Sequence, residues 1–172
     1  MAPLIRSVKL PTGVELPYAE QGDVSGIPLL LLHAIADSWR AFEPVLAHLP
    51  PSIHAYAVTQ RGHGDASRPA TGYRVPELAM DLAAFMDALR LDAAVIAGGS
   101  SGGFVARRFA IDRPERILRL ALLGSPAALR DNPSARKMWD STLSKLTDPV
   151  DPGFVREFAA STLAKPVRRD YF

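Results

Sequence analysis

Four short runs of the chain are almost entirely apolar, and longer stretches with a helical spacing of apolar residues lie between them. The runs are Leu29–Leu32, Ile53–Val58, Ala93–Ala97 and Ile117–Leu123. Polar residues interrupt them only at His54 and Arg119. Continuous apolar runs of this length are typical of strands buried on both faces of a parallel sheet. The pattern therefore predicts a right-handed, helix-covered and mostly parallel sheet of the α/β class.

The stretches between the runs carry helix signals. Pro76 can open a helix at its first turn, and the apolar residues that follow it share one helical face: Leu78, Leu82, Phe85, Met86 and Leu89. Ser38 can cap a helix that extends to Leu46. A third helix is predicted over Gly102–Ile111, directly after the third run.

The ends of the chain differ from this middle part. The runs Val8–Leu10 and Val14–Tyr18 flank a Pro-Thr-Gly turn, which predicts an N-terminal hairpin. After Gly124, Asn132 and Asp151 each stand before a proline, which predicts helices over about residues 133–146 and 152–164. We therefore divide the chain into a core, residues 1–124, and a helical segment, residues 125–172.

Composition narrows the classes of function. The 172 residues are 48% hydrophobic and 22% charged, which is typical of a globular domain. Twenty basic and eighteen acidic residues leave a net charge of +2, which predicts no nucleic-acid partner. The absence of cysteine excludes disulfides, thiolate zinc sites and a cysteine nucleophile. The longest apolar stretch, residues 27–36, is too short for a membrane span, and residues 1–6 lack a secretory core, so we expect a cytoplasmic protein without a membrane partner.

The loop after the third run contains a G-x-S-x-G pattern. It reads Gly98-Gly99-Ser100-Ser101-Gly102-Gly103 and lies between a predicted strand and a predicted helix, which is the context of a nucleophile elbow. A serine on so sharp a turn needs residues without side chains two positions before and after it, and Gly98 and Gly102 meet this need for Ser100. The N-terminus of the following helix would direct the N–H of Ser101 toward an oxyanion.

Two alternatives stay open at this loop. Ser101 can also be the central serine of the pattern. Ser100 is favoured because glycine then stands three residues on, where the helix crosses the strand, whereas Ser101 would place Phe104 there. The loop could instead only end a strand, or hold a phosphate at a helix N-terminus. Neither the P-loop lysine nor the dinucleotide pattern G-x-G-x-x-G is present in it.

Two further segments accompany the serine loop. Residues 32–42 begin Leu-His-Ala-Ile, and residues 60–67 read Gln-Arg-Gly-His-Gly-Asp-Ala-Ser. With the serine loop, in this order and near these spacings, they resemble three signature segments of the α/β-hydrolase fold family. The resemblance covers the chain from the hairpin to Phe172 and is greatest to the esterase, haloperoxidase and lipid-hydrolase branch. It implies an incomplete α/β-hydrolase-like sheet and the start of a helical cap over residues 125–172.

The resemblance also implies a site and a reaction. Ser100 matches the nucleophile, and the backbone N–H groups of Ile35 and Ser101 match the donors of the oxyanion hole. The implied enzyme is a serine hydrolase of a small, largely apolar carboxylic ester, thioester or lactone, without metal or organic cofactor. Serine at this position argues against haloalkane dehalogenases and epoxide hydrolases, which carry aspartate there. Perhydrolase, haloperoxidase and acyl-transfer activities would use the same residues and stay open as alternatives.

Three residues depart from the family pattern around the site. Ala34 stands where glycine is usual, Gly99 where a larger residue is common, and Thr59 where an aspartate often precedes the Arg-Gly-His-Gly loop. We expect the loop at Ala34 to be strained or redirected, because alanine lacks the conformational freedom of glycine.

The positions of the histidines are the largest departure from the family pattern, because the acid and the histidine of the family's catalytic triad follow the serine along the chain. All four histidines, His33, His48, His54 and His63, precede Ser100. We therefore interpret the chain as cut inside the cap and inactive alone, with the acid and the base in an absent C-terminal segment. His33 and His63 resemble structural members of their loops, and of the four histidines only His63 is considered as an alternative, substitute base. The spacings suggest no metal site. His48 and His54 are predicted to be surface or half-buried residues.

Two consequences follow from this interpretation. The first is an alternative function, because a chain without a triad base could be a catalytically inactive ligand-binding or interaction module. The second concerns partners. The strand Ile117–Leu123 would lack a neighbour on one side and present unpaired backbone groups. We therefore expect poor solubility, a homodimer, or a second chain that covers this edge.

Overall fold

A computed structural model of the chain describes residues 2–128, 132–147 and 149–161. The chain divides into two compact units, Met1–Ser125 and Pro126–Phe172, and each is described by itself. That the second unit begins a cap remains a prediction. Within the described ranges, no helix is long and apolar enough to cross a membrane.

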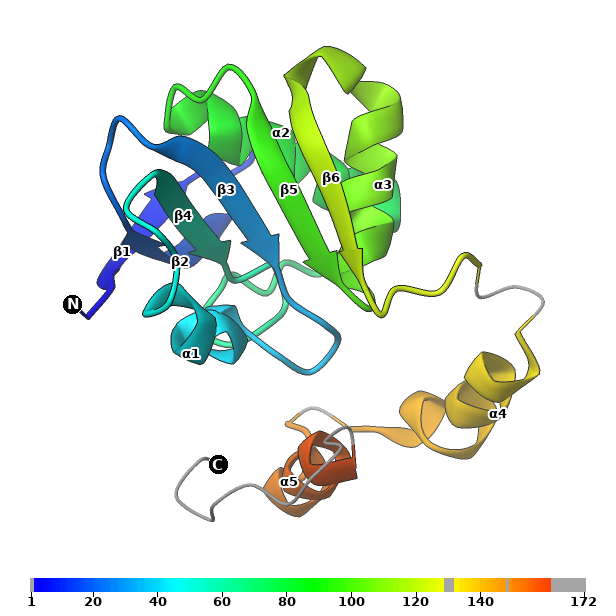
Figure 1. Cartoon of the computed structure of the whole chain (residues 1–172). Helices are drawn as coiled ribbons and strands as arrows, with labels where there is room; N and C mark the ends of the chain where they lie inside the picture. The colour runs from blue at the N-terminus through cyan, green and yellow to red at the C-terminus, as the bar shows by residue number, and fades with distance from the viewer. Residues whose placement is uncertain (1, 129–131, 148, 162–172) are drawn as a thin grey trace. The chain divides into compact units, whose positions relative to one another are not determined.

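Six strands form the sheet of the first unit (Figure 1). They are β1 (Leu4–Lys9), β2 (Glu15–Gln21), β3 (Ile27–Leu32), β4 (Ile53–Val58), β5 (Ala94–Gly99) and β6 (Ile117–Leu123). Their order across the sheet is β1-β2-β4-β3-β5-β6. The strands β3, β4, β5 and β6 run parallel, and the hairpin β1–β2 joins them antiparallel through β4. The predicted hairpin and mostly parallel sheet are confirmed.

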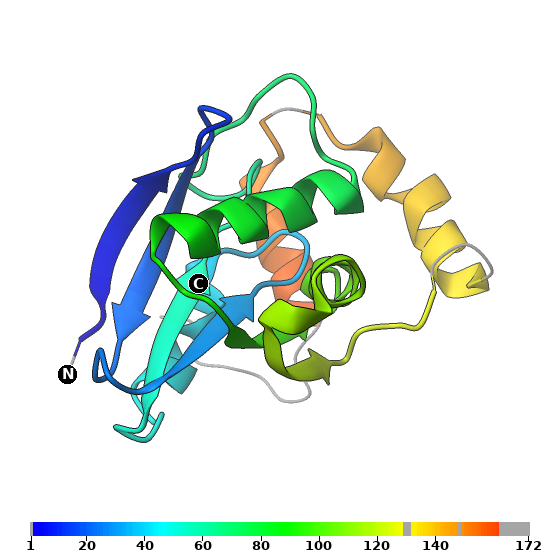
Figure 2. The same cartoon turned by 90° about the horizontal axis from the view of Figure 1, so that it is seen from above.

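Helices cover both faces of this sheet, as the view from above in Figure 2 shows. The helical elements of the first unit are η1 (Trp39–Phe42), α1 (Glu43–Leu46), α2 (Val75–Ala88), α3 (Gly102–Asp112) and η2 (Pro114–Arg116). On one face, Phe85 of α2 and Phe109 of α3 pack against Leu30 and Ile96 of the strands. On the other face, Trp39 and Leu46 pack against the sheet. Burial on both faces explains why the central strands are apolar without alternation.

The helix after Ser38 differs from the prediction. Ser38 caps it as expected, because its Oγ accepts the N–H of Arg40 at 3.3 Å. The helix is however a 3-10 turn followed by the single turn of α1, which has Pro44 near its start. Proline lacks the N–H that would continue the α-helical ladder back to Arg40, so one long helix does not form.

The second unit contains α4 (Pro133–Ser141), η3 (Leu143–Lys145) and α5 (Pro152–Ser161). Both predicted caps are present: Asn132 Oδ1 accepts the N–H of Ala135 at 3.1 Å, and Asp151 Oδ2 accepts that of Phe154 at 2.8 Å. The first helix ends earlier than predicted, because Thr142 leaves helical geometry at φ −135°. Residues 162–164 of the second predicted helix lie outside the described residues.

Candidate active site

The turn between β5 and α3 is sharpest at Ser100. Ser100 has φ +46°, which is rare for a residue other than glycine, whereas Ser101 has the helical angles φ −62° and ψ −34°. The N–H of Ser100 donates to the carbonyl of Leu123 at 2.9 Å, which fixes the turn to β6. Strained backbone of this kind costs about 1–3 kcal/mol and is concentrated at functional sites. Of the two serines, Ser100 therefore has the geometry of an elbow.

Glycine is required at the positions on either side of this turn. A Cβ on Gly98 would lie 2.6 Å from the carbonyl oxygen of Gly102, and a Cβ on Gly102 would lie 2.6 Å from that of His33 and also strike that of Leu32. Gly99 differs, because the nearest atom to its Cβ would be 3.8 Å away. The start of α3 is thus pressed against the end of β3. This contact brings the loop that carries Ile35 to the elbow.

We expect the change Gly102→Ala to lower the free energy of unfolding by about 1–3 kcal/mol, because its methyl group meets backbone atoms that cannot rotate away. Gly99→Ala adds the same methyl group at the last residue of β5 and is the matched control. Its free energy of unfolding is expected to change by less than about 1 kcal/mol. Urea unfolding of both variants measures the difference. Equal effects at the two positions would contradict the close contact between α3 and β3.

The loop after β3 is held by His33, whose side chain is buried. Its Nε2 accepts the backbone N–H of Gln60 at 3.0 Å, and its Nδ1 lies 2.7 Å from the carbonyl of Ala34. The imidazole is therefore neutral with its proton on Nδ1, since Nε2 must accept and Nδ1 must donate. Burial, with a smaller contribution from His63, lowers the pKa of His33 to about 4. His33 is a structural link between the ends of β3 and β4.

Two departures from the family pattern have structural consequences. The left-handed residue of the β3 loop is Ala36, at φ +66°, and Ala34 is not left-handed. The loop that was predicted to be strained or redirected thus has its left-handed residue at Ala36, two positions after the alanine that replaces glycine. Thr59 is buried, and its Oγ1 accepts the N–H of Trp39 at 3.1 Å. This hydrogen bond holds Trp39, at the end of the loop that follows β3, next to Thr59.

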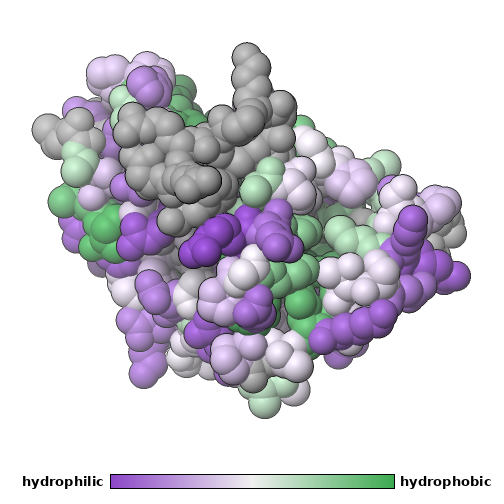
Figure 3. All heavy atoms as spheres, turned by 90° about the horizontal axis from the view of Figure 1, so that it is seen from below, coloured by the Kyte–Doolittle hydropathy of each residue, from purple (hydrophilic) through white to green (hydrophobic). Residues whose placement is uncertain are grey.

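The resemblance implies two backbone N–H donors, those of Ile35 and Ser101. Within the described part of the chain, neither N–H makes a hydrogen bond. The two loops that carry them meet where Gly102 contacts His33, at the carboxyl ends of β3 and β5, which is where open α/β sheets bind ligands. Figure 3 views the molecule from below, where hydrophobic side chains lie among hydrophilic ones. Two free N–H groups at such an edge can donate to a substrate oxygen.

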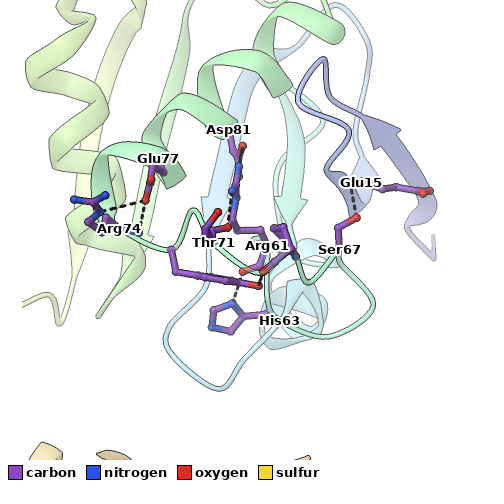
Figure 4. Close-up of polar contacts among 10 residues, drawn as sticks. Glu15, Arg61, His63, Ser67, Thr71, Arg74, Glu77 and Asp81 are labelled. Atoms are coloured by element: carbon purple, nitrogen blue, oxygen red, sulfur yellow. Dashed lines mark hydrogen bonds and ion pairs between the residues drawn. The ribbon is translucent and has the colours of Figure 1, made fainter. Parts of the chain in front are cut away.

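A buried ion pair anchors the third loop, residues 60–67, as Figure 4 shows. The guanidinium of Arg61 binds the carboxylate of Asp81 through two hydrogen bonds, one of 2.5 Å from Nη2 to Oδ1 and one from Nε to Oδ2. Both side chains are less than 10% exposed. Hydrogen bonding to Asp81 raises the pKa of Arg61. Because Asp81 lies on α2, the pair joins this helix to the loop.

The histidines do not form a catalytic group with the serine. Among the described residues, no hydrogen bond joins an imidazole to Ser100. The Nδ1 of His63 donates to the carbonyl of Arg61 at 3.0 Å, which leaves its Nε2 as an acceptor.

His48 is exposed as predicted. His54 is not: it is 5% exposed and bonded to Glu20 and Tyr56, which corrects its expected position. Within the described ranges, no cluster of three or more possible metal ligands is present.

Comparison with known proteins decides the family. The sequence pattern that defines the alpha/beta hydrolase fold matches residues 27–170. The chain belongs to the α/β-hydrolase fold family. The match includes the elbow and both accompanying loops. In this α/β-hydrolase chain the three segments follow the carboxyl ends of the parallel strands β3, β4 and β5.

Similar proteins include several enzymes. A soluble epoxide hydrolase from Corynebacterium sp. (strain C12) is 33% identical over 111 residues, which are 64% of this chain and 38% of that protein. A non-heme chloroperoxidase from Streptomyces lividans is 33% identical over 117 residues, 66% of this chain and 42% of that protein. A crystal structure of a hydrolase from Pseudomonas aeruginosa PA01 has a TM-score of 0.77 at 26% identity, covering 97% of this chain and 64% of that one. The chain spans less than half the length of these two curated relatives.

Proposed function

We propose that this chain is the serine-bearing part of a hydrolase that cleaves a small, largely apolar carboxylic ester, thioester or lactone. The left-handed geometry of Ser100 carries the proposal, because it lifts one hydroxyl out of the strand at the edge where ligands bind. The relatives named as hydrolases support hydrolysis in general. We infer cleavage at an ester-type carbonyl because the residue at the elbow is a serine, whose hydroxyl can attack such a carbonyl.

The proposed reaction has two steps. The Ser100 oxygen attacks the substrate carbonyl, its proton passes to a base, and the alcohol or thiol leaves with a proton. Water then releases the acid from the acyl-enzyme and restores the serine hydroxyl. In each step the carbonyl oxygen becomes negative, and the free N–H groups of Ile35 and Ser101 would stabilise that charge.

A fluorophosphonate probe tests the nucleophile. In the proposed mechanism the serine oxygen displaces fluoride from phosphorus, so the protein gains the mass of the phosphonyl group. In a completed protein, which also supplies a general base for the serine, we expect peptide mass spectrometry to find this group on Ser100, and Ser100→Ala to abolish labelling. Ser101→Ala is the matched control and should keep it. Labelling that survives Ser100→Ala and is lost in Ser101→Ala would assign the nucleophile to the neighbouring serine.

Turnover by the 172-residue chain is expected to be slow. A serine without a general base is a poor nucleophile, and an oxyanion hole with substrate binding supplies only about 10³–10⁴-fold acceleration over water. Hydrolysis of short-chain nitrophenyl esters by the purified chain measures this rate. Fast turnover that disappears in His63→Ala would overturn the expectation and make His63 the base, through the Nε2 that its bond to Arg61 leaves free.

A second candidate function is a catalytically inactive binding module. The observation that favours it is that no described histidine bonds to Ser100. Under this alternative, Ser100→Ala leaves the affinity for ester-like ligands unchanged and no acyl-enzyme forms with any ester. A burst of nitrophenol equal to the amount of protein would exclude it, because only covalent acylation releases one product molecule per site.

A further inference from the structure

A small cavity lies between the sheet and the helices α2 and α3. The space that it offers to the centre of a water molecule is about 10 Å³. One buried water molecule needs about 10–15 Å³ of such space, whereas pockets for organic ligands have volumes of about 300–1,000 Å³. The cavity is therefore just large enough for one water molecule. Its lining side chains are mostly apolar, with three polar ones among them: Leu16, Leu32, Val58, Leu78, Leu82 and Val105, and the polar Gln60, Arg61 and Asp81.

Gln60 turns an unpartnered acceptor toward this cavity. The residue is 9% exposed, and its side-chain nitrogen donates to the carbonyl of His33 at 3.1 Å. Reversing the amide would set two acceptor oxygens against each other, so this bond fixes its orientation. Since His33 does not line the cavity, the end of the amide that faces it is Oε1. Within the described part of the chain, this buried oxygen accepts no hydrogen bond, although buried polar atoms in native proteins are normally bonded.

The two charged residues of the cavity wall have bonding capacity left (Figure 4). The carboxylate of Asp81 accepts two hydrogen bonds from Arg61, and a carboxylate has about four acceptor positions. Arg61 has five N–H groups. Among the described residues, two of them have acceptors on Asp81 and one has the carbonyl of Thr71. The wall therefore offers acceptors on Gln60 and Asp81 and further donors on Arg61.

We propose that this cavity binds one water molecule, which donates to Oε1 of Gln60 and to the carboxylate of Asp81 and accepts from Arg61. Charge decides the class of occupant. A cation would meet the guanidinium of Arg61, and an anion would meet the oxygens of Asp81 and Gln60. Water is neutral and supplies two donors and an acceptor, and a buried water typically makes about three hydrogen bonds.

The bound water gives α2 a second connection to the loop that follows β3. Asp81 lies on α2, and Gln60 bonds to His33 through both its backbone N–H and its side-chain nitrogen. The water joins these residues directly, beside the ion pair between Arg61 and Asp81. This role does not depend on the reaction proposed for Ser100.

Nuclear magnetic resonance of the purified chain, with its leucine and valine methyl groups labelled, tests the site. A water molecule that stays bound for longer than the tumbling time of the protein gives laboratory-frame and rotating-frame Overhauser effects of opposite sign. We expect such cross peaks between water and the methyl groups of Val58, Leu82 and Val105, which are buried around the cavity. Their absence from the wild-type spectrum would overturn the proposal.

Gln60→Met tests the acceptor, because methionine keeps the length of the side chain and removes its oxygen. We expect loss of all three cross peaks. Gln21→Met is the matched control and should keep them: the Oε1 of Gln21 is also buried without a partner among the described residues, but Gln21 does not line this cavity. Cross peaks that persist in Gln60→Met would come from exchanging N–H groups of Arg61 and would overturn the site.

A crystal structure of the wild-type chain provides the same decision if Gln60→Met does not fold. We expect an ordered water oxygen within about 3.2 Å of both Oε1 of Gln60 and a carboxylate oxygen of Asp81. A cavity without electron density, or density bonded to neither residue, would overturn the proposal.

Discussion

Replacing Asp81 with alanine is expected to lower the free energy of unfolding by about 3–5 kcal/mol, the usual cost of removing one partner of a buried ion pair. The variant leaves the guanidinium of Arg61 buried without its carboxylate. An arginine cannot release its proton in a protein, so the cost cannot be avoided by neutralisation. Urea unfolding at neutral pH measures the loss.

Two comparisons show whether the buried charge is the cause. Asp112 pairs with Arg108 one turn away on α3, and both side chains are more than one third exposed. Asp112→Ala is the matched control and should change stability by no more than about 0.5 kcal/mol. In the second comparison, the double variant Arg61→Met, Asp81→Leu should recover most of the loss, because neither charge remains. A double variant as unstable as Asp81→Ala would mean that shape, and not charge, causes the effect.

The pair between Arg61 and Asp81 also connects stability to the site. Arg61 follows Gln60, whose N–H bonds to His33, and His33 begins the loop that carries Ile35. A chain of direct contacts thus runs from α2 to an implied oxyanion donor. Loss of Asp81 should therefore reduce the reactivity of Ser100 with the phosphonate probe as well as stability, since one donor of the site loses its support.

Much of the fold can be predicted from the sequence, because burial on both faces leaves a continuous apolar run. The predicted strands Ile53–Val58 and Ile117–Leu123 agree with β4 and β6 residue for residue. The sequence rules for helices gave wrong bounds where the helices are short. No periodicity signals that α1 is one turn long, and the early end of α4 depends on the backbone angles of Thr142.

The elbow could be located from the sequence because glycine is a steric signature. Gly98 and Gly102 have no room for a methyl group, and this requirement is visible in the sequence as a fixed spacing about Ser100. Whether Ser100 is the nucleophile stays a prediction until the probe experiment is done, and so do the roles of Ile35 and Ser101.

The supports of the site were not predicted, because they join residues distant in sequence. Thr59 was noted only as a departure from the family, yet its hydroxyl holds the loop at Trp39. One feature of the sequence pointed to a buried role for Asp81: it is a carboxylate three residues after Leu78, within the apolar face of α2. A charge at such a position needs a buried partner, but the sequence does not say which of the twenty basic residues it is.

Acidification from pH 6.5 to about 4 is expected to remove about 3 kcal/mol of stability through His33 alone. Burial lowers the pKa of His33 to about 4 in the folded chain, whereas an unfolded histidine titrates near pH 6.5. Between these values the unfolded chain binds a proton that the folded chain does not. Each step down in pH therefore favours unfolding, and the loss is complete once the pH is below the folded pKa.

His33→Gln isolates this contribution. A glutamine can place its side-chain oxygen where Nε2 accepts the N–H of Gln60, but it does not titrate. The variant should be less stable than the wild type at neutral pH, because it loses the bond to the carbonyl of Ala34. Its free energy of unfolding should nevertheless fall less steeply between pH 6.5 and 4. Urea unfolding at half-unit pH intervals measures both slopes. Parallel curves would show that His33 takes up its proton at the same pH in the folded and the unfolded chain, and would contradict the lowered pKa of the buried imidazole.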